Sequence, residues 1–373
     1  MKKKYIIFSL VTLVLLVALI TSFNYFKTTN TYIDDSVNNQ TKITKGISMN
    51  LEQTAGAGDY KTVTQSSWPT EGYKFNAELS RCENGSTLSW DDTKKAVIVS
   101  GNLSDKCYVY FDKILTLAEY VISQYTGTQG SNGIYYHNST LANGAGDNSY
   151  RYAGASDSVN NYICLGSDAT TCPDANLFRI IGVFGDQTKV IRAKSVGDQP
   201  WHTSQVNNWS SSSLNTYLNG EYLTSLGTLA EKIATTTWKV GGNTSANISG
   251  VVPKTAYQYE VGSSASTTTY DAKIGLMYVS DYGFAADQSG WTTKLSSYNS
   301  NTSKNWLYLG STEWTISRDS DDTNYAFRVT STGDVLHSNV TDSYAVRPSF
   351  NLESSVKYVS GSGSMSDPVR VTD

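Results

Sequence analysis

The sequence contains few histidines and has no excess of basic over acidic residues. There are three histidines among 373 residues, at positions 137, 202 and 337, and they lie far apart in polar segments. No Gly-x-Ser-x-Gly elbow or other nucleophile motif accompanies them, so a Ser-His-Asp triad has no local support. The formal net charge of -4 argues against nucleic acid as a partner, because such binding depends on a basic surface.

Charged side chains are also few. They make up 17% of the chain, against roughly 25% in ordinary soluble domains. Ser, Thr, Asn and Gly supply the polarity instead, together with 26 Tyr and 8 Trp. Such a composition is typical of extracellular β-proteins, whose turns need Gly and Asn and whose strands favour Thr, Tyr and Val. Abundant aromatic residues exclude a disordered chain.

The N-terminus predicts a single-pass membrane anchor. Three lysines at positions 2–4 precede an apolar run from Tyr5 to Phe23, and about twenty apolar residues span a bilayer as a helix. We expect residues 1–4 to be cytoplasmic, residues 5–23 to cross the cell membrane, and the rest to be extracellular. A cleaved signal peptide is the alternative, but Ala18 to Ser22 match a cleavage site poorly. No cysteine lies directly after the apolar run, which excludes a lipoprotein.

The four cysteines form two local pairs. Neither pair has Cys-x-x-Cys spacing, and no histidine lies near enough to suggest zinc. In an oxidising compartment we expect the disulfides Cys82–Cys107 and Cys164–Cys172. Free buried thiols are the alternative.

The pattern along the chain predicts a linker and two folded parts. Residues 24–72 are rich in Thr, Asn, Gln and Ser and are interpreted as a stalk, with a short strand at Ile47 to Leu51 as an alternative. Residues 73–112 alternate in hydrophobicity and predict a small β domain held by the first disulfide. Residues 113–125 predict a connecting amphipathic helix. Residues 126–373 predict one α+β domain, in which Leu214 to Leu226 form a helix.

Within this domain, several segments resemble an uncharacterised family of surface domains from Gram-positive bacteria. The resemblance covers roughly Asn176 to Asn351, and its most specific part is the Arg-Pro-x-Phe-x-Leu ending at residues 347–352. The segments that carry it are Trp209, Leu214 to Leu223, Ile274 to Met277, Trp306-Leu307, Trp314-Thr315 and Val346 to Leu352.

More distantly, the domain is similar to the C-type-lectin-like scaffold of formylglycine-generating enzymes and phage receptor-binding proteins. This resemblance implies a compact α+β domain with two helices and a twisted antiparallel sheet. It transfers no catalytic residue, because those enzymes hold copper with a late cysteine pair and no cysteine follows Cys172 here. It also favours Arg347 as a buried structural arginine paired with a carboxylate.

Aromatic residues are the strongest binding signal. Their flat faces stack on sugar rings while Asn, Asp and Ser bind the hydroxyls, and the same composition suits protein contacts. Four of them lie in turn-rich segments and are the predicted ligand-binding residues: Trp201, Trp209, Trp291 and Tyr298. Core or loop-pinning roles are the alternative. Trp238, Trp306 and Trp314 lie in apolar stretches and are predicted to be core.

Acidic residues suggest two further sites. Asp319, Asp321 and Asp322 share one loop that offers oxygen ligands for Ca²⁺, with a solvated acidic turn as the alternative. No other cofactor is expected. A glycoside hydrolase would need a pair of carboxylates beside aromatic residues. The candidates for that pair are Glu260, Asp271, Asp281, Asp287 and Glu313.

The sequence therefore predicts a fold with a transmembrane helix, a small disulfide-stapled β unit and a C-terminal lectin-like α+β domain with an antiparallel sheet. The expected function is non-enzymatic binding of a glycan, a cell-wall polymer or a protein partner at the cell surface. A cell-envelope hydrolase and a structural component of a surface assembly are the alternatives.

Overall fold

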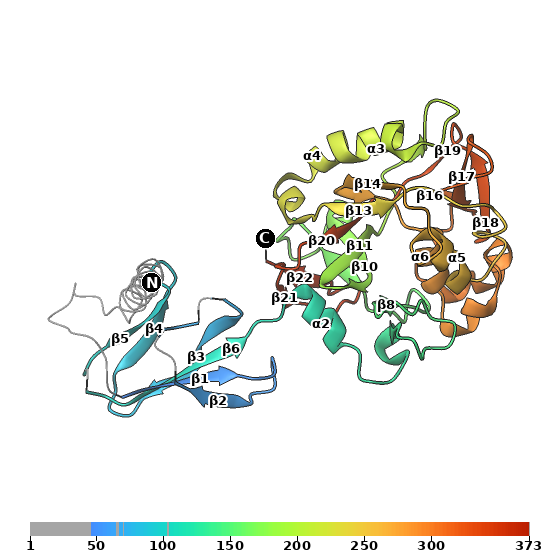
Figure 1. The fold of residues 1–373 in the computed structure, drawn as a ribbon. Coiled ribbons are helices and arrows are strands. Elements are labelled where there is room, and N and C mark those ends of the chain that lie inside the picture. The colour runs from blue at the N-terminus through green and yellow to red at the C-terminus, as the bar shows by residue number, and fades with distance from the viewer. Residues whose placement is uncertain (1–45, 65–66, 70, 103, 373) are drawn as a thin grey trace, which may run out of the picture. The chain divides into compact units, whose positions relative to one another are not determined.

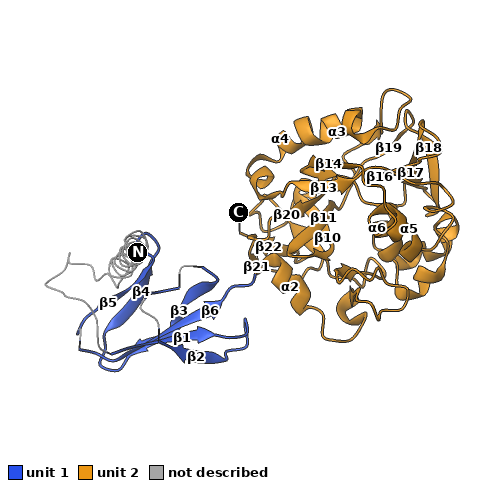
Figure 2. Ribbon diagram, in the orientation of Figure 1, with its two compact units in different colours: residues 1–115 blue, residues 116–373 orange. Residues whose placement is uncertain are grey.

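The computed structural model describes residues 46–64, 67–69, 71–102 and 104–372. The predicted tail (1–4), the anchor (5–23) and the first part of the stalk lie outside this range. Among the described residues, none of the helices combines the length and the apolar character needed to cross a membrane. The chain divides into two compact units, residues 1–115 and 116–373 (Figure 2).

The first unit is built from strands alone in its described part. A four-stranded sheet has the order β2-β1-β6-β3, and β4 and β5 form a separate hairpin. The strand bounds are β1 (Ile47–Glu52), β2 (Tyr60–Val63), β3 (Tyr73–Cys82), β4 (Thr87–Asp91), β5 (Ala96–Ser100) and β6 (Cys107–Lys113). The predicted disulfide Cys82–Cys107 is present and joins paired positions of β3 and β6.

The boundary of this unit differs from the prediction. Strand β1 pairs in parallel with β6, and Met49 and Leu51 are buried against Val109 and Phe111. Residues from Ile47 onward therefore belong to the β unit and not to the predicted stalk of residues 24–72. The short strand at Ile47 to Leu51, which was the alternative to the stalk, is present as β1. Its pairing with β6 could not be predicted locally, because the partner strand lies about 60 positions later in the chain.

The second unit is mostly sheet with short helices. Its nine-stranded sheet has the central order β15-β20-β11-β10-β9-β22-β21, with β8 and β7 attached beside β10 (Figure 1). The strand bounds are β7 (Ile134–Tyr136), β8 (Tyr150–Tyr152), β9 (Tyr162–Cys164), β10 (Leu177–Phe184), β11 (Gln187–Arg192), β15 (Ile274–Gly275), β20 (Ser349–Leu352), β21 (Tyr358–Ser360) and β22 (Val369–Val371). The second predicted disulfide, Cys164–Cys172, is also present and begins in β9.

Two smaller sheets complete the strands of this unit. One has five strands in the order β12-β19-β16-β17-β18, and the other is the pair β13-β14. Their bounds are β12 (Asp198–Pro200), β13 (Thr236–Lys239), β14 (Thr269–Ala272), β16 (Glu313–Arg318), β17 (Tyr325–Val329), β18 (Val335–Asn339) and β19 (Ser343–Ala345). The nine-stranded and five-stranded sheets, which are the two larger sheets of this unit, are mainly antiparallel. Each contains one parallel pair, β9–β22 and β16–β19 respectively.

The helices of this unit are short. They are α2 (Leu117–Ser123), α3 (Ser213–Tyr217), α4 (Leu223–Ser225), α5 (Pro253–Glu260) and α6 (Val279–Phe284). Helix α2 lies inside the predicted connecting helix of residues 113–125, and its cap is Thr116, whose hydroxyl accepts the Glu119 amide. The predicted helix at Leu214 to Leu226 corresponds to α3 and α4 joined by one wider turn, Leu218–Tyr222.

The central hairpin follows from a continuous apolar run. Seven of the eight residues of β10 are buried, as expected for a strand covered on both faces. Gly182 interrupts the run, and the register of β10 shifts there. A Cβ at Gly182 would collide with the Tyr150 carbonyl, so glycine allows β8 to pair with β10. This pairing sets Arg151 opposite Gly182.

A buried ion pair links the two larger sheets. Arg347 lies between β19 and β20, and its guanidinium donates to both carboxylate oxygens of Glu313 at 2.6 and 2.8 Å. It also donates to the Leu307 carbonyl at 2.6 Å. The two side chains are only 2% and 1% exposed, so the expectation that Arg347 pairs with a carboxylate is confirmed.

Breaking this pair from one side should be costly. Arg347→Met leaves Glu313 buried without its counter-charge, and we expect a loss of about 3–5 kcal/mol in the free energy of unfolding. The measurement is urea unfolding of the full-length chain followed by tryptophan fluorescence. The double variant Glu313→Leu/Arg347→Met should recover part of the loss, because no charge remains unpaired. A loss below about 1 kcal/mol in the single variant would contradict this account.

Candidate functional site

The four aromatic residues predicted to bind ligand are buried. Trp201, Trp291 and Tyr298 are fully inaccessible, and Trp209 is 1% exposed. Three of the four use their polar atoms inside the protein: Trp201 donates to the Thr315 carbonyl at 3.0 Å, Trp291 to the Ala286 carbonyl at 2.9 Å and Tyr298 to the Gly283 carbonyl at 2.6 Å. The prediction that these rings form a binding surface is therefore corrected. The turn residues around them indicated exposure, but in the structure each ring is buried inside the protein.

The acidic loop forms a hydrogen-bonded turn. Asp319 is 2% exposed, and its carboxylate accepts the Asp321 amide at 2.9 Å and faces His337 Nδ1 at 2.6 Å. The Asp322 carboxylate accepts the Asn324 amide at 2.9 Å. Within the part of the chain that the structure describes, no group of three or more His, Cys, Asp or Glu is arranged to hold a metal. The geometry is that of the acidic turn, which was the alternative to the predicted Ca²⁺ site.

A serine, a histidine and an aspartate do meet beside this turn. Ser245 Oγ lies 3.2 Å from His337 Nδ1 and donates to Asp319 at 3.1 Å. In a catalytic triad the aspartate and the serine bind opposite ring nitrogens. Here both contacts fall on Nδ1, and the serine hydroxyl is directed to the carboxylate. The cluster therefore lacks the geometry of a nucleophile and its base.

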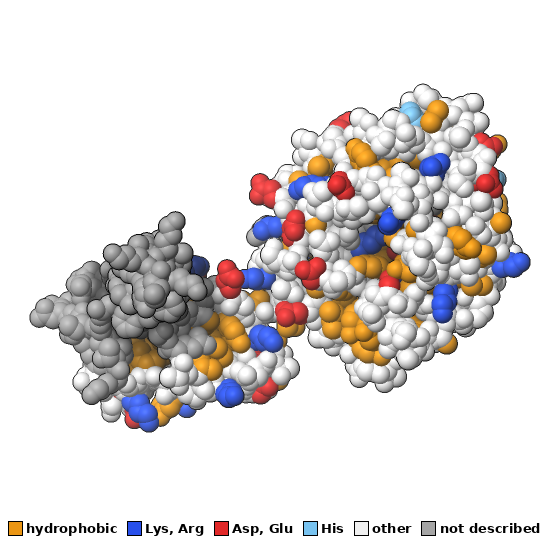
Figure 3. Space-filling view, viewed as in Figure 1, with side chains coloured by type: hydrophobic (Ala, Val, Ile, Leu, Met, Phe, Trp, Pro, Cys, Tyr) orange, Lys and Arg blue, Asp and Glu red, His pale blue; other side chains and the backbone are white. Residues whose placement is uncertain are grey.

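A different site lies in the middle of the second unit. We call it the central hollow; it has a volume of about 160 Å³ and is lined by residues of β8, β10, β11, β13, β20, α5 and α6. Figure 3 shows a recess in this face where basic and acidic side chains lie among apolar ones. The side chains that define it are Asp147, Arg151, Lys189, Trp238, Tyr257, Tyr278 and Asp281.

Two cations and two carboxylates alternate along the hollow. Lys189 Nζ lies 2.5 Å from Asp281, Arg151 lies 3.7 Å from the same carboxylate, and Arg151 donates to Asp147 at 2.6 Å. Burial raises the pKa of Asp147, but the charge of Arg151 and hydrogen bonds from Ser149 outweigh it and lower the pKa overall. The two positive and two negative charges cancel, so the hollow is polar but has no net charge.

Aromatic rings surround both cations. Lys189 Nζ lies 4.8 Å from the centre of the Tyr278 ring and 5.4 Å from that of Trp238. Arg151 lies 4.6 Å from the centre of the Phe184 ring. Cations in these positions are attracted by the negative ring faces. The rings therefore hold the two cations in place and also form the apolar wall of the hollow.

Helix α6 positions Asp281. The Asp281 carboxylate accepts the Tyr278 amide at 2.9 Å, one turn before it. Glu260, at the end of α5, accepts the amides of Val279 and Ser280 at 2.9 and 2.7 Å and also accepts the Ser317 hydroxyl. A carboxylate at these free amides stabilises the start of the helix. Burial raises the pKa of Glu260.

His137, directly after β7, is fully buried. Its Nδ1 accepts the Ala145 amide at 3.0 Å, so Nε2 carries the proton, and that nitrogen has no hydrogen-bond partner. The ring packs between Phe284 and Trp291. Burial, together with the charge of Arg151, lowers the pKa of His137 well below its usual 6.5.

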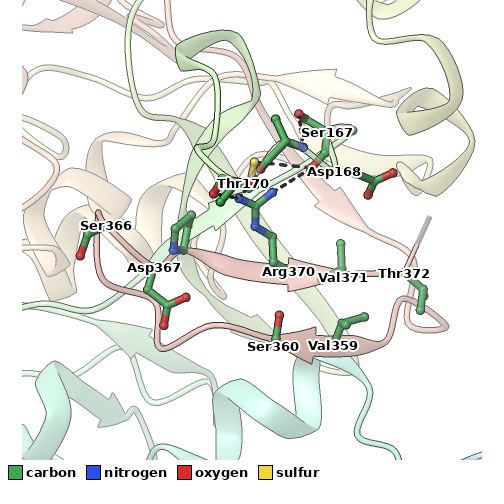
Figure 4. A pocket seen from close by; sticks show the side chains of 14 residues that line it. Ser167, Asp168, Thr170, Val359, Ser360, Ser366, Asp367, Arg370, Val371 and Thr372 are labelled. Atoms are coloured by element: carbon green, nitrogen blue, oxygen red, sulfur yellow. Dashed lines mark hydrogen bonds between the residues drawn. The ribbon is translucent and has the colours of Figure 1, made fainter.

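A larger hollow of about 530 Å³ borders the Cys164–Cys172 loop (Figure 4). Its arginine, Arg370, donates to the carbonyls of Ser167, Ala169 and Thr170 at 2.9–3.2 Å. Backbone oxygens thus occupy the guanidinium, which closes the disulfide loop onto β22. We therefore regard this arginine as structural.

Sequence reasoning named Asp281 as one candidate carboxylate but missed its partners. Arg151 lies in a loop-rich stretch, and Lys189 lies inside a hairpin strand that is otherwise buried. A lysine in such a strand is the signal that was available, because lysine is almost never fully buried unless it is paired. The predicted core residues Trp238, Trp306 and Trp314 are buried as expected.

The buried neutral state of His137 predicts a stability that depends on pH. Below about pH 6.5 the unfolded chain binds a proton on this ring and the folded chain does not, so stability falls as the pH is lowered. Between pH 6.5 and 5.0 the slope should reach about 1.4 kcal/mol per pH unit. The measurement is urea unfolding across this range. His137→Gln should flatten the slope, with His202→Gln as the control; equal slopes in the wild type and His137→Gln would rule this origin out.

Comparison with known proteins places a family match on this unit. Residues 185–354 match the family described as "Domain of unknown function (DUF6273)", and this stretch contains Lys189, Asp281 and Arg347 but ends short of Arg151 on the N-terminal side. No curated protein and no solved structure matches the chain significantly. The comparisons therefore show that residues 185–354 match a domain of unknown function.

Proposed function

We propose that the chain is a membrane-anchored surface protein that binds a glycan or a cell-wall polymer through the central hollow. The observation that carries this proposal is the charge-balanced, aromatic-lined recess around Lys189 and Asp281. On this proposal the second unit has a lectin-like role on a C-type-lectin-like scaffold. Its mainly antiparallel sheets and short helices are compatible with that scaffold.

The chemistry of the hollow favours an uncharged ligand with many hydroxyl groups. Lys189 has three N–H groups and makes one hydrogen bond inside the protein, to Asp281. Thr236, Thr237 and Asn351 add further polar groups at the same recess. Because the local charges cancel, a ligand gains more from hydrogen bonds and ring contact than from net charge. Sugar rings supply both.

The size of the hollow limits what enters it. About 160 Å³ is smaller than the roughly 300–1,000 Å³ of typical ligand pockets. We infer that one sugar residue or one acyl group enters, while the rest of the polymer lies outside on the surface. Such a site binds one unit of a repeating chain. Each contact is weak, but a polymer offers many identical units to which it can bind.

The proposed location rests on sequence and on disulfide chemistry. Lys2 to Lys4 and the apolar run to Phe23 predict an anchor with the folded part outside. Two disulfides and the absence of free cysteine among the described residues suit an oxidising compartment. The resemblance to Gram-positive surface domains supports a bacterial cell surface.

The hydrolase alternative is less well supported by the same site. A carboxylate-pair mechanism needs one carboxyl with a raised pKa to act as the acid. The carboxylates that line the hollow, Asp147 and Asp281, are both paired with cations. Burial does raise the pKa of the nearby Glu260, but its carboxylate already accepts a backbone amide at the start of α6.

A binding assay with a matched pair of variants tests the proposal. The full-length chain in non-ionic detergent is incubated with insoluble peptidoglycan, wall polymers and immobilised glycans. We expect retention of the wild type on one of these ligands. Tyr257→Ala removes a wall of the hollow and should weaken retention about fivefold or more. Tyr259→Ala, on the same helix but outside the hollow, should bind as the wild type does.

The outcomes separate the candidate functions. Release of soluble fragments that Asp281→Asn abolishes would replace the proposal with the hydrolase. No retention on any carbohydrate would leave a protein partner as the better hypothesis. Equal loss in both tyrosine variants would show that the helix, and not the hollow, is responsible.

A further inference from the structure

A second cavity lies at the other face of strand β11. Arg192 is three positions after Lys189, and side chains an odd number of positions apart leave opposite faces of a strand. This cavity has a volume of about 380 Å³. Its walls come from β10, β11 and the turn at residues 225–229, and we call it the Arg192 cavity. No acidic residue lines it.

The charge of Arg192 is unmatched within the described residues. The three buried arginines there each have acceptors: Glu313 for Arg347, Asp147 for Arg151, and Asn161 for Arg179. By contrast, Arg192 makes no ion pair among the described side chains, and its buried Nε has no hydrogen-bond partner. A buried donor on a charged group without an acceptor is costly unless something outside the chain satisfies it.

A second unpartnered group faces the same cavity. Tyr222 is 5% exposed, and its hydroxyl lies beside the Arg192 guanidinium but has no acceptor for its proton among the described residues. Burial raises the pKa of Tyr222 to about 12, although the charge of Arg192 opposes the rise. The hydroxyl therefore keeps its proton at neutral pH and remains a donor.

We propose that the Arg192 cavity binds an oxyanion, a phosphate or carboxylate group, held by the Arg192 guanidinium and the Tyr222 hydroxyl. A planar guanidinium matches the paired oxygens of both groups. The bound group neutralises Arg192 and accepts from both donors. A wall polymer with phosphodiesters, an acidic sugar and free phosphate all present this chemistry. The site is separate from the central hollow and does not depend on the function proposed for it.

Titration with simple anions tests the site without knowing the natural ligand. The full-length chain in detergent is heated in increasing sodium phosphate or sodium acetate, with sodium chloride at equal ionic strength as the reference. We expect the unfolding midpoint to rise saturably with phosphate, acetate or both. Tyr222→Phe, which removes one oxygen atom, should weaken the apparent affinity about tenfold. Arg192→Gln should abolish the response.

Two further variants keep the test decisive. Lys254→Gln removes an equal charge from an exposed position outside the cavity and should respond as the wild type does. Arg192→Lys keeps the charge without the planar fork and should respond weakly, which covers the case that Arg192→Gln fails to fold. A response to phosphate alone or to acetate alone identifies the anion class. A wild-type chain that responds only to ionic strength, or an unchanged response in both Arg192→Lys and Tyr222→Phe, would overturn the proposal.

Discussion

The ion pair between Arg347 and Glu313 controls how the two larger sheets of the second unit meet. Three residues separate the end of β19 from the start of β20, so the chain passes from one sheet to the other almost at the position of Arg347. The pair thereby sets where β20 begins, and β20 places Asn351 opposite Lys189 on β11. A buried pair of this kind contributes little net stability compared with an apolar core, but it penalises every other alignment.

Strand β11 carries two cations in different electrostatic states. Lys189, on one face, is balanced by Asp281 and surrounded by aromatic rings. Arg192, on the other face, has no carboxylate partner among the described residues. One short strand therefore supports a neutral polar recess and a positive cavity that differ in the ligands they favour. The family match spans both positions, so both belong to the part of the chain that resembles other proteins.

Local sequence signals predicted the elements but not the sites. Helical spacing of apolar residues in 113–125 indicated α2, and alternation in residues 73–112 indicated strands of the first unit, because each pattern lies within a few neighbouring positions. The cysteine spacing predicted both disulfides. The central hollow was missed because Arg151, Lys189 and Asp281 meet only through tertiary pairing across 130 residues of sequence. Trp201 and Trp291 were misjudged for the opposite reason: their polar neighbours suggested exposure, while burial was decided by distant segments.

The order of the strands in the sheet has a consequence for synthesis. The first unit completes its described sheet with β6, so it can fold while later residues are still being made. In the second unit, β20 and β22 come late in the chain but lie beside β11 and β9 from its early part. Strand β11 must therefore wait with an open edge for about 160 further residues, and β9 for about 206. During this interval the free edges of β9 and β11 are targets for chaperones or for unwanted pairing with a neighbouring nascent chain.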